Sequence, residues 1–452
     1  MTKDKRCSKM SLIHSKDIGK VKMKIDFTDP EVKRHMFDAE FGLEKESLRV
    51  TPDGYLPDTT HPFSQDSNIQ RDFCNAQTEI ITGVHSKMED VCRELCDIHS
   101  QAVRVLAQRK EGQEYIWPFS NPPYVKSDDD IAVADYTGEK REWKIYREYL
   151  AEKYGKKKML YCGIHFNFSF ADSLLFALRR NQDVDDLVDL KNQLYLDVSQ
   201  KLMKYSWLIV YLTAASPLAD GSFFDSQQLG KSVVTGYASS RCGREGYWNL
   251  FLPVLDYSDV ESYVDSIRQY IKDGSLKAEK ELYYPIRLKA RGEYSLSNVQ
   301  EKGIHYMEFR LLDVNPFSPY GIEPKDLSFV HYLILYLLSR EESMGTKESM
   351  QAIDNIHTAA LLDDEEGFIL WEKGEGQPIR GLAEHILRDM MDFYRELDTE
   401  RDVLPVLSYQ LDKIVKPKEN RYVTRLLREY GSDFVGRGMV LARENTQKIV
   451  QG

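Results

Sequence analysis

The chain contains 452 residues, 42% of them hydrophobic and 29% charged, so it can bury a large core and is too long to be one small module. This composition excludes a chain that is mainly disordered, collagen-like or coiled-coil. The formal net charge is -11, from 61 basic and 72 acidic residues, and no basic stripe stands out. Nucleic acid is therefore not an expected partner.

The N-terminal residues, the longest apolar run and the cysteines indicate in which compartment we expect the protein. Residues 1–25 are polar and rich in lysine, without the apolar run of a secretory signal, and we predict a flexible N-terminal tail there. The longest apolar run, residues 207–215, is far shorter than the roughly 20 residues that a membrane-spanning helix needs, so we expect no membrane partner. Six cysteines in a chain of this length do not suggest a disulfide framework, and we expect a reducing, cytoplasmic environment.

Strand-like alternation and helix-like periodicity follow one another along the chain. Alternation predicts strands at residues 38–50, 75–81, 160–170, 281–290 and 304–314. Helical periodicity predicts helices at residues 87–109, 184–210, 258–273, 325–340, 380–397 and 434–449. Strands dominate the middle and helices the C-terminal third, which favours an α+β fold with an antiparallel sheet over a βαβ array.

The domain organisation follows from the same pattern. No strand signal appears after about residue 340, and no linker is obvious. We therefore predict a core over residues 26–340 and a helical C-terminal subdomain over residues 341–452 that packs on it.

Polar residues recur two positions apart inside the predicted strands, where their side chains point to the same face. The pairs are Glu44 with Glu46, His165 with Asn167, Arg287 with Lys289, and Glu308 with Arg310, and Asp72 and Glu79 flank the start and end of the second strand. One such pair alone is more often a solvated sheet face. Several pairs together indicate a site, since Phe166 and Phe168 leave the opposite face apolar.

If these faces converge, five carboxylates crowd together and do not all stay ionised without cations. Carboxylates with one histidine and one amide oxygen suit hard divalent ions such as Mg²⁺ or Mn²⁺. Arg241, Arg287, Lys289 and Arg310 then remain to hold an anionic substrate, which points to chemistry on nucleotide phosphates. No Walker A or Gly-x-Gly-x-x-Gly pattern is present, so neither a P-loop protein nor a Rossmann enzyme is indicated.

At these residues the chain resembles a known family. The segment Phe41-Gly-Leu-Glu-Lys-Glu-Ser-Leu-Arg-Val50 is similar to the opening motif of glutamate–cysteine ligase (γ-glutamylcysteine synthetase) of the bacterial type, including the N-terminal ligase part of bifunctional glutathione synthases. Further matches follow in the same order over residues 37–325, among them Trp117-Pro-Phe-Ser120, Tyr146-Arg-Glu148, Gly163-Ile-His-Phe-Asn-Phe-Ser169, Gly246-Tyr-Trp-Asn249, Tyr306-Met-Glu-Phe-Arg310 and Asp313-Val-Asn-Pro-Phe-Ser-Pro319. About ten motifs in register make a specific signal.

The resemblance implies a fold related to glutamine synthetase, in which a curved antiparallel sheet forms a funnel with helices outside. It also implies roles for individual residues. The metal ligands would be Glu44, Glu46, Asp72, Glu79, His165 and Glu308. Asn167 and Arg241 would lie at the glutamyl substrate, and Arg310 would face the transferred phosphate, with Arg287 and Lys289 also on the nucleotide. The pocket for cysteine would be formed by Phe73, Tyr136, Tyr247 and Tyr283.

The activity that the resemblance implies is the ATP- and Mg²⁺-dependent ligation of the γ-carboxylate of L-glutamate to the amine of L-cysteine through a γ-glutamyl phosphate. This reaction is the first step of glutathione biosynthesis. The expected partners are these small molecules. Because the chain ends at residue 452 without a second ATP-grasp domain, we expect only this first ligation.

Some positions depart from the family pattern. Met159 stands where the family usually has a glutamine that helps line the cysteine pocket, and Cys162 stands where it has a serine. Arg287-Leu288-Lys289 replaces the usual Arg-Pro-Lys and keeps both cations. Because Met159 removes an amide from the pocket, a γ-glutamyl ligase with another amine acceptor stays open as an alternative. A catalytically silent nucleotide-binding homologue is a second alternative, which the complete acidic set disfavours.

Overall fold

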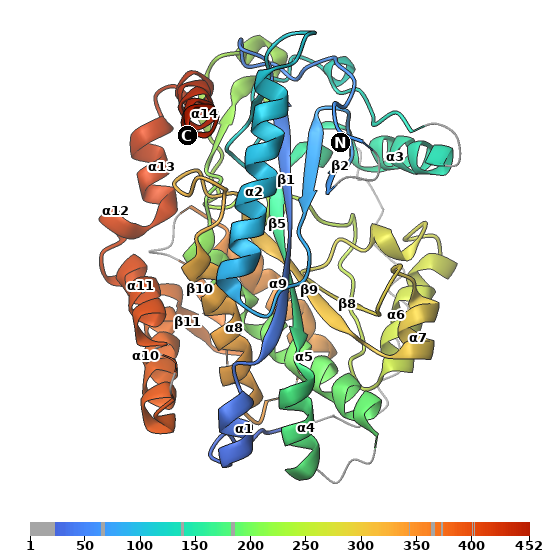
Figure 1. Cartoon of the computed structure of the whole chain (residues 1–452), viewed down its shortest axis with the longest axis vertical. Helices are drawn as coiled ribbons and strands as arrows, with labels where there is room; N and C mark the ends of the chain where they lie inside the picture. Colours follow the sequence, from blue (N-terminus) through green and yellow to red (C-terminus); the bar gives the residue numbers. More distant parts are fainter. Residues whose placement is uncertain are drawn as a thin grey trace, which may run out of the picture.

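A seven-stranded sheet, antiparallel at every pairing, runs through the middle of the molecule, with helices packed around it (Figure 1). The computed structural model describes residues 23–64, 68–136, 140–181, 186–342, 344–362, 367–371, 374–399, 401 and 403–452. The strands run in the order β2-β3-β1-β5-β9-β8, and β4 pairs with β1 outside this path. They are β1 (Ala39–Val50), β2 (Ile69–Arg71), β3 (Gln77–Ile81), β4 (Tyr115–Ile116), β5 (Gly163–Phe170), β8 (Ile286–Lys289) and β9 (Tyr306–Asp313).

The helices up to residue 340 lie around this sheet. They are α1 (Pro30–His35), α2 (Met88–Ala107), α3 (Arg141–Tyr154), α4 (Asp172–Asn181), α5 (Leu187–Thr213), α6 (Val260–Lys272), α7 (Leu296–Lys302) and α8 (Pro324–Leu338). Helices α2 and α5 pack directly on the sheet, and α8 packs on both of them. Together with the short β6–β7 hairpin (Leu218–Asp220 and Ser232–Val234), these elements confirm the predicted α+β class.

Each central strand has one face toward the helices and one face away from them. Phe166 and Phe168 of β5 are buried against Phe41 of β1, at 5.9 and 6.2 Å between ring centroids, and the ring of His331 from α8 lies 5.2 Å from that of Phe41. Since strand side chains alternate, His165 of β5 points to the opposite face. The predicted alternation at this strand is confirmed, and we call the face away from the helices the open face.

Where the structure describes it, the C-terminal segment is helical apart from one short hairpin. Its helices are α9 (Thr346–Ala359), α10 (Ile379–Leu397), α11 (Leu404–Val415), α12 (Pro417–Asn420), α13 (Tyr422–Tyr430) and α14 (Phe434–Gln451). The expectation that no strand follows residue 340 is wrong, because Phe368–Leu370 (β10) and Gly376–Pro378 (β11) pair in a hairpin. Strands of three residues are too short to show alternation in a sequence. Side chains of these helices belong to the same continuous hydrophobic cluster as the sheet.

Residues 1–22 of the expected tail lie outside the described residues, whereas its last residues are anchored in the core. Met23 and Ile25 are buried, and the main-chain N–H of Ile25 donates a hydrogen bond to the carbonyl of Leu338 at 2.9 Å. Met23 and Ile25, which the sequence placed in the tail, therefore belong to the core. Among the described residues, no helix is at once long enough and apolar enough to cross a membrane.

A buried ion pair ties the C-terminal helices to the sheet layer. Asp326 of α8 accepts hydrogen bonds from Lys413 (2.6 Å), Gln410 (2.8 Å) and Tyr422 (2.8 Å), all on C-terminal helices. The Lys413 and Asp326 side chains are 0% and 1% exposed, so neither charge is screened by solvent.

We expect Lys413→Met to destabilise the protein by about 3–5 kcal/mol, because it leaves the Asp326 carboxylate buried without its cation. The measurement is urea unfolding followed by circular dichroism. Arg388→Met is the control, since its partner Glu384 lies on the surface, and it should change stability by less than about 1 kcal/mol. Equal effects of the two substitutions would contradict the assigned role of the buried pair.

Candidate active site

Strands β1 and β3 bring three glutamates to the open face. Glu44 and Glu46 lie two residues apart on β1, and Glu46 is directly opposite Glu79 of β3 in the antiparallel register. The main-chain N–H of Gly163 donates a 2.8 Å hydrogen bond to the Glu46 carboxylate, and the Asn167 amide donates one of 3.0 Å to Glu44. Both glutamates are therefore held in fixed positions from strand β5.

His165 enters this group at an irregularity of the sheet. The register between β5 and β9 shifts between Ile164 and Phe166, so that Arg310 and Leu311 of β9 lie opposite the single residue His165. Such bulges re-aim side chains next to functional sites. The His165 Nδ1 atom lies 3.0 Å from a Glu44 oxygen and 3.3 Å from Nη1 of Arg310. Glu44, Glu79 and His165 each offer one ligand atom within 4.8 Å of the others.

Strands β8 and β9 supply the cations. Glu308 of β9 is 1% exposed, and its Oε1 atom lies 2.9 Å from Arg310 Nη1 and 3.0 Å from Lys289 Nζ. Arg287 Nη1 is 3.9 Å from the other oxygen, Oε2, which has no hydrogen-bond partner among the described residues. Burial alone would raise the pKa of Glu308, but these three cations hold it well below its usual range.

On the other side of the cavity, Glu46, Asp72 and Glu79 are not compensated in this way. For Glu44, burial and the charge of Glu308 are outweighed by the hydrogen bond with His165 and the charge of Lys289, so its pKa is lowered. Burial, with the charges of Asp72, Glu44 and Glu46, raises the pKa of Glu79 well above its usual range. Burial and Asp72 raise the pKa of Glu46 to about 7, and burial also raises that of Asp72. Burial, together with the charge of Arg310, lowers the pKa of His165 to about 4, which leaves its imidazole neutral. Negative charge is in excess here.

These residues surround one cavity of about 880 Å³. Thirteen of the residues singled out from the sequence line it: Glu44, Glu46, Asp72, Phe73, Glu79, Met159, His165, Tyr247, Tyr283, Arg287, Lys289, Glu308 and Arg310. Residues far apart in the sequence thus meet in a single space, with an acidic side on β1 and β3 and a cationic side on β8 and β9.

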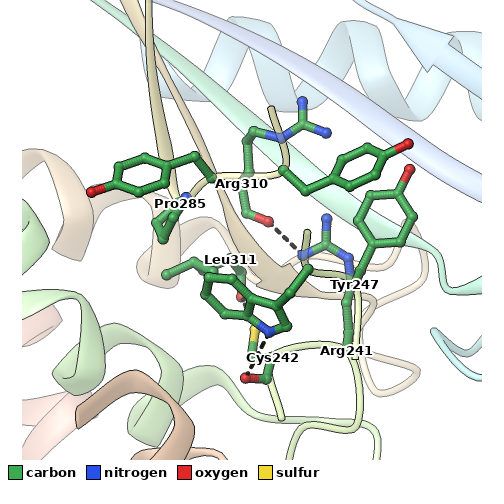
Figure 2. Close-up of a pocket in the computed structure, with 9 residues that line it drawn as sticks. Arg241, Cys242, Tyr247, Pro285, Arg310 and Leu311 are labelled. Atoms are coloured by element: carbon green, nitrogen blue, oxygen red, sulfur yellow. Dashed lines mark hydrogen bonds between the residues drawn. The ribbon is translucent and has the colours of Figure 1, made fainter. Parts of the chain in front are cut away.

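Two predicted residues lie next to the cavity without lining it. Asn167 contacts Glu44 as described above. Arg241 is buried beneath the cavity, in a smaller pocket that Tyr247, Tyr283 and Arg310 also line (Figure 2). One of its guanidinium nitrogens donates to the main-chain carbonyl of Arg310, and another lies 3.4 Å from Nε2 of His165. Its Nε atom has no hydrogen-bond partner among the described residues.

Tyr136 is not brought into the cavity. Its hydroxyl donates to the main-chain carbonyl of Arg71 at 2.8 Å, and its ring lies between the guanidinium groups of Arg71 and Arg147, at 4.2 and 4.8 Å. It lines a separate small pocket with Trp143. Tyr146, which the sequence analysis did not single out, lines the larger cavity.

Five cavity residues carry no assignment in the sequence analysis: Trp143, Tyr146, Arg147, Leu150 and Lys280. Tyr146 and Arg147 lie on α3, and the motif Tyr146-Arg-Glu148 is the sequence signal that could have identified them. The Tyr146 hydroxyl is buried without a hydrogen-bond partner among the described residues, and the Lys280 ammonium lies 4.0 Å from the centre of its ring. The Arg147 guanidinium donates to the main-chain carbonyl of Asp72.

Comparisons with known proteins agree on one family. The family model described as glutamate-cysteine ligase matches residues 25–359. The chain is 35% identical over 406 residues to the glutathione biosynthesis bifunctional protein of Listeria monocytogenes, covering 86% of this chain and 52% of that protein. It is 32% identical over 437 residues to the corresponding protein of Clostridium perfringens, covering 90% and 56%. The chain therefore belongs to the glutamate–cysteine ligase family.

Solved structures show the same fold. A bifunctional glutathione synthetase from Pasteurella multocida matches with a TM-score of 0.80 and 30% identity, over 94% of this chain and 54% of that one. A glutamate–cysteine ligase from Francisella tularensis, solved in complex with AMP, matches with a TM-score of 0.78 and 24% identity, over 91% and 89%. The chain spans about half the length of the bifunctional relatives it matches.

In the absence of divalent ions, we expect Glu79→Gln to raise the free energy of unfolding by on the order of 1 kcal/mol, because folding must otherwise either bury this carboxylate beside others or protonate it, and both are costly. Glu308→Gln should lower it, because that carboxylate is held by three cations. Thermal unfolding in EDTA at neutral pH measures both. The same sign of effect for the two substitutions would contradict the uneven charge of the cavity.

Proposed function

We propose that this chain is a glutamate–cysteine ligase, which uses ATP to join the γ-carboxylate of L-glutamate to the amine of L-cysteine. The supporting observation is the single cavity in which six candidate metal ligands face three cations. In the proposed reaction the γ-carboxylate attacks the γ-phosphate of ATP, giving γ-glutamyl phosphate and ADP. The amine then attacks the acyl carbon and phosphate leaves. We assign this chemistry to a core over residues 26–340, with residues 341–452 as a supporting subdomain.

We propose that Mg²⁺, or Mn²⁺ in its place, binds on the acidic side. The donor set fits a hard ion: Glu44, Glu79 and neutral His165 offer atoms within 4.8 Å of one another, with Glu46 and Asp72 beside them. The Oε2 atom of Glu308 is a further buried acceptor without a hydrogen-bond partner among the described residues. When bound, the ion offsets the charge that otherwise repels a carboxylate from ATP.

The cationic side is suited to phosphate. Lys289, Arg287 and Arg310 line the cavity side by side and already hold one carboxylate, that of Glu308. We assign Arg310 to the transferred phosphoryl group, because its guanidinium also contacts His165 and so lies between the acidic and cationic sides. Fixed donors of this kind stabilise charge that develops in the transition state.

The remaining wall is aromatic and suits the acceptor. The rings of Tyr247 and Tyr283 are 4.5 Å apart, and Phe73, Met159 and Tyr146 complete this side. An aromatic wall excludes water, and this exclusion protects an acyl phosphate from hydrolysis. We assign Arg241 and Asn167 to positioning the glutamyl substrate, since both contact residues of the acidic side from just outside the cavity.

The decisive experiment is ADP release by the purified chain with ATP, Mg²⁺ and L-glutamate, against a panel of amines that includes L-cysteine and L-2-aminobutyrate. We expect cysteine to stimulate release most and the product to have the mass of γ-glutamylcysteine. Stimulation by a different amine would keep the γ-glutamyl ligase and reject cysteine. Met159→Gln would then test whether the thioether on the wall sets the preference. No release with any amine, despite ATP binding, would contradict the proposal.

Removal of metal tests the acidic side. EDTA should abolish turnover and added Mg²⁺ should restore it. Glu79→Gln should lower kcat by about 10³-fold or more, because it removes a ligand from the ion that offsets phosphate charge. Glu384→Gln, on the surface of α10, is the control and should leave turnover unchanged. Activity of Glu79→Gln near that of the unmodified chain would contradict the metal assignment.

Tyr146 and Tyr136 provide a matched pair for the acceptor wall. Tyr146→Phe should raise the KM for the amine by about 10-fold, because its unpartnered hydroxyl is available to the acceptor. Tyr136→Phe should leave that KM unchanged, since its hydroxyl is already bonded to a main-chain carbonyl outside the cavity. Steady-state kinetics with varied amine concentration measures the KM of each variant. The reverse ranking would show that the acceptor lies in the other pocket.

A further inference from the structure

A second cavity lies behind the sheet, on the helix-covered face of β1. Its walls come from five parts of the chain: β1, helix α2, the segment 116–118, the loop after β9 and helix α14. The cavity is small and partly open, and its wall is mixed, with the apolar residues Val103, Ile116, Pro118, Val314, Pro319 and Ala442 beside the polar residues Lys45, His99, Ser318, Asn445 and Thr446. Nothing in the proposed ligase reaction uses this cavity.

The cavity contains a buried lysine without a counter-charge. Lys45 lies between Glu44 and Glu46 on β1 but points to the opposite face, where it is 3% exposed. Its ammonium contacts Nδ1 of His99 at 3.2 Å. Among the described residues, no carboxylate lies within 4.0 Å of it.

Within the described part of the chain, the other buried lysines each contact a carboxylate, which Lys45 does not. Of the described lysines, Lys201 and Lys413 are the two others that are buried, and each contacts a carboxylate at 2.6 Å, that of Asp197 or Asp326. Burying an ammonium without such a partner is costly.

The neighbours of Lys45 do not supply a negative charge. Burial, together with the Lys45 ammonium, keeps the pKa of His99 well below its usual range, so His99 is neutral and accepts through Nδ1. The hydroxyls of Ser318 and Thr446 donate to main-chain carbonyls, at 2.5 and 2.9 Å. The half-buried Asn445 amide, on α14, lines the cavity and has no hydrogen-bond partner among the described residues.

We propose that this cavity binds a small monovalent anion, either a halide or the carboxylate of a one- or two-carbon acid, between the Lys45 ammonium and the Asn445 amide. The anion replaces the carboxylate that the other two buried lysines have. The small size of the cavity favours a small monovalent ion over phosphate or sulfate. The site is separate from the proposed active site, because Lys45 and the two glutamates beside it point to opposite faces of β1.

The test measures thermal unfolding while chloride, formate or acetate replaces gluconate at constant ionic strength and constant pH. We expect the Tm to rise with anion concentration and to saturate, as binding to the folded state alone requires. Lys45→Met, which keeps the stem and removes the charge, should weaken the anion dependence by at least 10-fold. Comparing the chloride series with the formate and acetate series shows whether the site binds a halide or a carboxylate.

Lys191→Met is the matched control. Lys191 also contacts a histidine, with 2.9 Å between its Nζ atom and His305 Nδ1, but it is partly exposed and has the charges of Asp172 and Glu40 nearby. This variant should keep the anion dependence. Equal responses of the unmodified chain and Lys45→Met, or no response of the unmodified chain, would overturn the proposal.

A second variant covers the case in which Lys45→Met does not fold. Asn445→Leu fills the cavity from a half-buried position and should also abolish the saturable rise in Tm. Line broadening of chloride NMR signals by the unmodified chain, and its loss in Asn445→Leu, gives a readout that is independent of unfolding. Full anion dependence in Asn445→Leu would overturn the proposal. None of these measurements depends on ligase activity.

Discussion

The architecture depends on holding several carboxylates close together inside the protein, where each one is costly to bury. The two sides of the cavity differ in how far nearby cations compensate this cost. On the β8–β9 side, Glu308 contacts Lys289 and Arg310, and its pKa falls. On the β1–β3 side, Glu46 and Glu79 face each other without such partners, and the pKa of each rises. A cavity built in this way attracts cations on one side and anions on the other, which is the arrangement that a nucleotide with divalent ions requires.

Such an arrangement needs a rigid support, and the two-residue period of β1 and β5 provides it. The residues that alternate with the charged ones lie in the core, where Phe41, Phe166 and Phe168 pack against one another and on His331. A slip of one residue in register would place these phenylalanines in the cavity and the charges in the core. The apolar face therefore fixes the positions of the charged one.

Much of this was predictable, because alternation and paired charges are local properties of a sequence. The strands at β1, β5 and β9 and the facing of His165 follow from them. Two features depend on long-range contacts instead. The bulge that sets Arg310 beside His165 arises from the register between two strands. Which tyrosine lines the cavity, Tyr146 rather than Tyr136, depends on where α3 places its side chains, and the sequence offers many tyrosines for such a position. The predicted strand 281–290 is shorter, because residues 279–281 form a 3₁₀ turn before β8 begins at Ile286.

The two functions of the cavity walls come from different kinds of element. Strands carry the acidic and cationic groups, and their spacing is set by main-chain hydrogen bonds. The acceptor wall comes instead from elements outside the sheet, with Tyr146 on helix α3, Met159 in a 3₁₀ turn, and Tyr247 and Tyr283 in loops. A substitution on that wall changes shape and hydrogen bonding without moving a charged strand. In the proposed reaction, phosphoryl chemistry and acceptor preference are therefore separable, and an unusual residue such as Met159 bears on the second without weakening the case for the first.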